Sequence, residues 1–129
     1  MTIEMRYLLA TTVLTALIRV PWMVNKVTVR GSKNVVGYPS ESEPLAGWAR
    51  RLWYAHQDAL DNLVIFAPLI VLVYLADASS RLTEIAAGVY FWSRTIHAVV
   101  YALAWPWIKT AAYLAGFAAQ LLLAWELIV

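Results

Sequence analysis

Apolar residues fill four stretches of this chain, and three of them are long enough for a helix to cross a bilayer. The hydrocarbon core of a membrane is about 30 Å thick and takes about 20 residues of helix. The three long stretches cover residues 7–24, 82–103 and 107–129. The other stretch, residues 63–76, is too short to span a membrane without residues on its N-terminal side.

Those additional residues lie in the segment GWARRLWYAHQDALDN, residues 47–62, which has no proline or internal glycine and is rich in good helix formers. Trp105-Pro106 ends one helix and opens the next, because proline suits the first turn of a helix but not its interior. The pattern predicts one all-α domain, an integral membrane bundle of four transmembrane helices. We expect the helices at about residues 5–26, 46–76, 81–104 and 106–128, with a cytoplasmic loop at about 27–45.

Composition narrows the class of protein. With 62% hydrophobic residues and a mean hydropathy of +0.64, the chain is too apolar for a soluble globule. It has no cysteine, which excludes disulfides and cysteine ligands, and its two histidines argue against a structural metal site. The basic residues form no stripe with aromatic residues, so we expect no nucleic acid partner. Their bias toward the first and third connections predicts that both termini lie outside.

Polar residues of two predicted helices fall into stripes at similar depth in the cytoplasmic half. Arg94, His97 and Tyr101 lie three and four residues apart, on one helical face. On the helix at 46–76 a second stripe consists of Arg51, Tyr54, Asp58, Asp61 and Asn62, while His56 points elsewhere. Charges inside a membrane usually face a partner or a wet cavity. We therefore expect a pocket between the stripes, with a contact between Arg94 and Asp61.

A purely structural interpretation stays open. Buried arginine and aspartate side chains also neutralise one another and hold helices in register. A single histidine on an apolar face is more often a packed core residue than a ligand. His97 gains functional weight from its neighbours Arg94 and Tyr101. His56 lies off that face and is expected to serve packing or an interface.

Three segments resemble the MAPEG family, the membrane-associated proteins in eicosanoid and glutathione metabolism. They are GWARRLWYAHQDALDNLVIF (residues 47–66), RTIHAVVY (94–101) and WPWIKTAAY (105–113), and they are most similar to the bacterial branch. The resemblance implies a homotrimer in the bacterial inner membrane. It also implies glutathione as co-substrate, held between neighbouring subunits in the cytoplasmic half of the membrane, and no metal.

The resemblance assigns roles residue by residue. Positions of the glutathione-binding type are Arg51, Asp58, Asp61, Arg94, His97 and Tyr101; the candidate catalytic residues are Lys109, at the thiol-activating position, and Tyr101. The chain departs from the family at four of its positions. Asp58 stands where asparagine is usual, Asp61 where glutamate is usual, and Tyr54 where several animal members have arginine. Lys109 replaces an arginine, so it supplies charge without the forked donor geometry.

The function that follows is a membrane-bound glutathione transferase or peroxidase acting on lipophilic small molecules. The alternative is a catalytically silent member of the same fold, serving as an accessory subunit or a binder of lipophilic ligands. A small transporter or channel has less support, because the charges gather in one half of the bundle and mark no path across it.

Overall fold

The computed structural model describes residues 1–30 and 47–129, and within them it contains four α-helices and no strand. The helices are α1 (Ile3–Arg30), α3 (Gly47–Leu75), α4 (Arg81–Ala102) and α5 (Pro106–Ile128). The predicted all-α four-helix fold is confirmed. The first helix extends to Arg30 instead of ending near residue 26. Most of the expected cytoplasmic loop, residues 31–45, lies outside the described residues.

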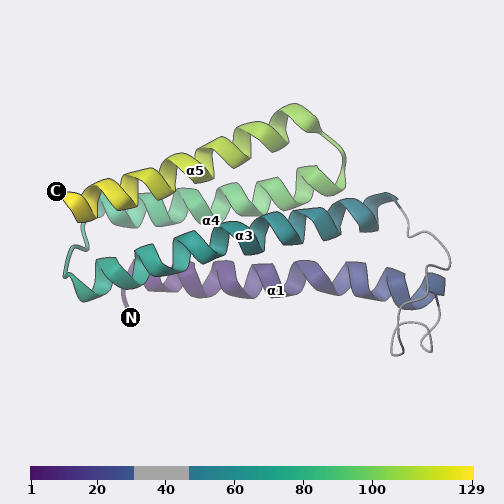
Figure 1. The fold of residues 1–129 in the computed structure, drawn as a ribbon, viewed down its shortest axis with the longest axis horizontal. Helices are drawn as coiled ribbons and strands as arrows, with labels where there is room; N and C mark the ends of the chain where they lie inside the picture. The colour runs from purple at the N-terminus through teal and green to yellow at the C-terminus, as the bar shows by residue number, and fades with distance from the viewer. Residues whose placement is uncertain (31–46) are drawn as a thin grey trace.

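The helices lie side by side along one long axis (Figure 1). Both termini and the α3–α4 turn lie at one end of the bundle, which we call the terminal end. The α4–α5 turn lies at the opposite end, together with the C-terminal end of α1 and the N-terminal end of α3; we call it the α4–α5 end. Segments Ile3–Val29, Gly47–Leu75 and Pro106–Ile128 are long and apolar enough to cross a membrane. The chain is an integral membrane protein.

Two tight turns set the positions of the helix ends. Asp77 after α3 and Ala104 after α4 have positive φ angles of 52° and 62°. In each turn, two backbone N–H groups reach back to the last helical turn, as in a Schellman motif. Ala104 N donates to Tyr101 O at 3.1 Å, and Trp105 N donates to Val100 O at 3.0 Å. The chain therefore reverses within a few residues, and the start of α5 lies against the end of α4.

The apolar core lies between α3, α4 and α5. Phe66 and Tyr90 stack with their ring centroids 3.8 Å apart, and Ile70, Val73 and Leu123 are buried around them. Many large apolar side chains point outward instead. In water such an apolar surface would cause aggregation, whereas in a bilayer it faces hydrocarbon.

A polar cluster fixes the terminal end. The buried carboxylate of Glu4 accepts hydrogen bonds from Ser79 Oγ at 2.6 Å and Thr83 Oγ1 at 2.5 Å. Ser80 and Thr83 form a capping box at the start of α4. The sequence interpretation gave Glu4 no role. The cluster ties α1 to the α3–α4 turn.

Candidate functional site

Arg94 is the most unusual residue of the bundle, because its cationic head is enclosed between α4 and α5. The side chain is only 2% exposed. Its guanidinium carbon lies 5.3 Å from the ring centroid of Tyr90 and 5.2 Å from that of Tyr113. Space for it exists because residue 116 is glycine: a Cβ there would lie 2.9 Å from a guanidinium nitrogen. None of its three nitrogens has a hydrogen-bond partner among the described residues.

The expected contact between Arg94 and Asp61 is wrong. Asp61 is exposed on α3, and its side chain forms no ion pair or hydrogen bond with another residue in the described ranges. Arg94 turns toward α5, where Gly116 leaves room and two aromatic faces attract the cation. Within one chain, Arg94 and Asp61 therefore do not neutralise one another or hold α3 and α4 in register.

His97 joins the polar residues of α3 and α4. Its Nε2 atom lies 4.0 Å from Asp58 Oδ2, and its ring centroid lies 5.5 Å from that of Tyr101. The Asp58 carbonyl accepts a hydrogen bond of 2.7 Å from Asn62 Nδ2. Gln120 Nε2 on α5 donates in turn to Asn62 O at 3.1 Å. A line of polar contacts thus connects α3, α4 and α5 through the apolar interior.

A polar pocket of about 240 Å³ opens at the α4–α5 end. Arg51, Tyr101 and Lys109 line it together with residues 104–106 of the turn. The Lys109 Nζ atom lies 4.6 Å from the Tyr101 ring centroid, and Arg51 Nε donates to the carbonyl of Ala102 at 3.0 Å. Two cations at one small pocket favour an anionic ligand.

The predicted residues fall into three groups. Arg51, Tyr101 and Lys109 meet at the polar pocket, Asp58 and His97 pair beside it, and Arg94 lies deeper on α4. Asp61 and Tyr54 are exposed on α3. His56 points away from the site, as expected, with Nδ1 3.0 Å from the carbonyl of Thr15 on α1.

Sequence reasoning missed Tyr113 and Gly116, the two residues of α5 that contact or accommodate Arg94. Tyr113 also lies 6.3 Å from His97, between ring centroids. A signal was present in the sequence: Lys109, Tyr113, Gly116 and Gln120 follow one another at spacings of four, three and four residues. That spacing places them on one face of a helix.

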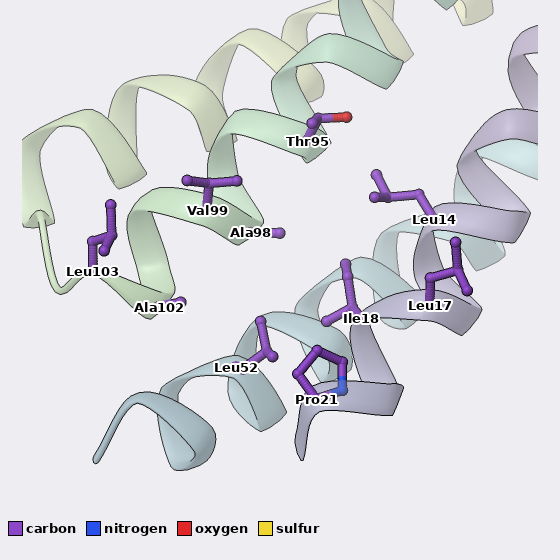
Figure 2. A pocket seen from close by; sticks show the side chains of 10 residues that line it. All are labelled: Leu14, Leu17, Ile18, Pro21, Leu52, Thr95, Ala98, Val99, Ala102 and Leu103. Carbon is purple, nitrogen blue, oxygen red and sulfur yellow. The ribbon is translucent and has the colours of Figure 1, made fainter. Parts of the chain in front are cut away.

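An apolar pocket of about 400 Å³ lies on another side of α4 (Figure 2). Its lining residues belong to α1, α3, α4 and the turn after α4, and Ala98 of α4 and Leu14 of α1 point toward each other across the gap. Thr95 is the one polar residue among them, and its hydroxyl donates to the carbonyl of Phe91. Leu52 and Ala102 line this pocket, whereas their chain neighbours Arg51 and Tyr101 line the polar one. The two pockets therefore flank the last turn of α4.

Comparison with known families gives one result for nearly the whole chain. The model of the MAPEG family matches residues 8–129. No curated protein and no solved structure matches the chain significantly.

Proposed function

The chain belongs to the MAPEG family, and from this we propose that it is a glutathione-dependent transferase or peroxidase acting on lipophilic electrophiles within the membrane. One observation carries the proposal: a buried arginine with three nitrogens that no described residue satisfies. A buried charge with no counter-ion and no hydrogen-bond acceptor is costly even between aromatic rings, and proteins keep such charges mainly where they serve binding or transport. Glutathione has two carboxylates, which match the forked donors of arginine.

The dimensions support this ligand. Arg94 and Tyr101 are seven residues apart on α4, which corresponds to a rise of about 10 Å. An extended tripeptide also spans about 10 Å. In our proposal, one glutathione carboxylate binds Arg94, and the other end of the tripeptide lies in the polar pocket near Arg51. His97 lies between these two points and contacts Tyr101.

Lys109 supplies the proposed chemistry. An ammonium beside the glutathione sulfur favours the thiolate over the thiol and lowers the thiol pKa. In a transfer, the thiolate forms a sulfur–carbon bond, and the electron pair of the broken bond leaves with the displaced group or moves to the acceptor, which takes up a proton. In a peroxide reduction, the thiolate attacks one oxygen, the O–O bond breaks and the released alkoxide takes up a proton; a second glutathione then converts the resulting sulfenic acid to the disulfide and water. Tyr101 lies under the Lys109 ammonium and positions it. The apolar pocket on the other side of the last α4 turn offers space for a lipophilic substrate.

A homotrimer belongs to the same proposal. Tyr54 and Asp61 are exposed on α3, although they share its polar face with Asp58. In a trimer these side chains face a neighbouring subunit, which would complete the glutathione site.

The proposal also includes a bacterial inner membrane with both termini outside. Asp58 weakens the affinity by repelling the glutathione carboxylates.

Calorimetry of glutathione binding to the full chain in nanodiscs tests the proposal. The wild type should bind saturably, and Arg94→Met should lose binding. Arg94→Met should also make the ligand-free protein more stable, because methionine fills the space without a buried charge. Arg19→Met, which removes an exposed arginine of α1, is the matched control and should leave glutathione binding unchanged. Unchanged binding in Arg94→Met would refute the proposed site.

The second candidate function is a catalytically silent protein that binds lipophilic ligands or serves as an accessory subunit. It is favoured by Lys109, whose ammonium already contacts the Tyr101 ring and replaces the arginine expected of the family. Turnover of a small chloronitrobenzene with glutathione distinguishes the two. Saturable glutathione binding without turnover of this or other lipophilic electrophiles would favour the silent protein.

A further inference from the structure

A groove lies between α1 and α4 at the terminal end, far from the polar pocket. Its volume is about 590 Å³. The residues that α4 contributes include Arg81, Glu84, Gly88, Trp92 and Ile96, which follow at spacings of three and four and form one stripe along the helix. From Arg81 to Ile96 the stripe rises about 22 Å, more than half the thickness of a hydrocarbon core of about 30 Å. The groove thus extends through one leaflet.

Two opposite charges stand at the mouth of this groove. Arg81 and Glu84 lie in the first turn of α4, three residues apart and therefore on neighbouring positions of the helix surface. Neither side chain forms an ion pair or a hydrogen bond with the other, or with any other side chain in residues 1–30 and 47–129. Both charges are consequently available to a ligand.

The remainder of the groove is mostly apolar. A Cβ at Gly88 would lie 3.3 Å from the Tyr7 ring, so the glycine lets Tyr7 of α1 lie directly against α4. Ile85, Val89 and Trp92 also line the groove and are 50%, 42% and 58% exposed. The site therefore combines a dipolar mouth at the end of the span with a long apolar channel below it.

We propose that this groove binds one ethanolamine phospholipid from the leaflet at the terminal end. The phosphate accepts hydrogen bonds from the Arg81 guanidinium, the primary ammonium donates to Glu84, and one acyl chain lies along α4 over Gly88. The headgroup suits the mouth because only an ethylene bridge separates its phosphate from its ammonium. A choline headgroup cannot donate a hydrogen bond to Glu84, and a glycerol headgroup has no cation for it. This inference is independent of glutathione binding.

Native mass spectrometry of the delipidated full chain, titrated with palmitoyl-oleoyl lipids, tests the inference. We expect the ethanolamine lipid to bind about fivefold more tightly than the choline or glycerol lipid, the effect of one exposed charge-assisted contact. Glu84→Gln should remove the preference over the choline lipid. Arg81→Gln should weaken binding of all three lipids. Arg6→Gln, which removes an exposed arginine near the same end but outside the groove, should leave binding unchanged.

A blocking variant separates the groove from the rest of the lipid-facing surface. Ile85→Trp puts a larger side chain into the groove and should abolish the tight binding. Leu82→Trp adds the same ring at an exposed position of α4 that does not line the groove, so it should behave like the wild type. Equal affinity for the three lipids, or wild-type binding by Ile85→Trp, would overturn the proposal.

A second copy of the chain is the competing occupant. Because the protein has no cysteine, Ile85→Cys introduces a single thiol. Efficient disulfide dimerisation of this variant in membranes would show that another subunit covers the groove and would also overturn the proposal. The proposal is supported if this thiol forms no disulfide between subunits and if bound ethanolamine lipid protects it from a thiol-labelling reagent.

Discussion

Replacing Gly116 by alanine tests whether the space beside α5 determines the position of Arg94. In a helix interior, alanine is favoured over glycine by about 1 kcal/mol. Here the added Cβ would lie 2.9 Å from one guanidinium nitrogen and 3.2 Å from another. The guanidinium must then move out of its place between Tyr90 and Tyr113. Overpacking costs about 1–3 kcal/mol, and two contacts this short place the cost at about 2–3 kcal/mol, the upper part of that range.

The effect of Gly116→Ala on the free energy of unfolding should have opposite signs in the wild type and in Arg94→Ala. In the wild type, Gly116→Ala should lower the free energy of unfolding by about 1–2 kcal/mol, since steric loss exceeds the gain in helix propensity. In Arg94→Ala the guanidinium is absent, and the same substitution should raise the free energy of unfolding by about 1 kcal/mol. The coupling energy between the two sites is therefore about 2–3 kcal/mol.

Unfolding of the four proteins in detergent, followed by tryptophan fluorescence, measures this coupling. Glutathione affinity provides a second readout, because a displaced guanidinium cannot hold the carboxylate as before; Gly116→Ala should weaken binding while Arg94 is still present. Additive effects of the two substitutions, within about 0.5 kcal/mol, would refute the reasoning.

Three further predictions concern the turns, the terminal end and the thiol. Ala104→Gly should raise the free energy of unfolding by about 1 kcal/mol, because glycine adopts positive φ without strain, whereas Ala111→Gly on the exposed face of α5 should lower it by about as much. Glu4→Ala should lower it by about 2–3 kcal/mol by removing the charged acceptor that the Ser79 hydroxyl and the buried Thr83 hydroxyl share. Glu4→Gln should lower it by less; equal losses in thermal melts would contradict a role for the charge. Lys109→Ala should slow glutathione turnover about tenfold, with a smaller change in affinity, whereas Lys109→Arg keeps the charge and should keep the wild-type rate. An unchanged rate in Lys109→Ala would argue against thiolate stabilisation.

Much of the fold follows from the sequence because a bilayer leaves few alternatives. Each backbone polar group in hydrocarbon must be bonded within its own helix, so a long apolar run indicates a spanning helix. The boundary between α4 and α5 was readable from Trp105-Pro106, since Pro106 is the first residue of α5. The C-terminal end of α1 was expected about four residues too early, although residues 22–30 contain no glycine or proline and Gly31 directly follows the last helical residue.

The candidate site was predictable only within each helix. Helical spacing placed Arg94 and His97 on one face, and both are buried. Spacing does not say which neighbouring helix that face meets, and the answer depended on a missing Cβ at Gly116, on another helix. Asp58 is near His97, whereas Asp61, one turn further along α3, is exposed. Which of the two aspartates meets α4 depends on the rotation of α3 about its own axis. The residue spacing within one helix does not contain that information.

The contact between Glu4 and the α3–α4 turn has a consequence for biogenesis. Glu4 is synthesised 75 residues before Ser79 and 79 residues before Thr83. While α1 and α3 enter the membrane, the carboxylate has neither hydroxyl partner and must stay hydrated at the bilayer surface. Only insertion of the α3–α4 hairpin lets it become buried. The first helix to be synthesised is thus among the last to make its stabilising contacts. An insertion machinery that releases helices one by one must therefore hold α1 close until α4 has been inserted.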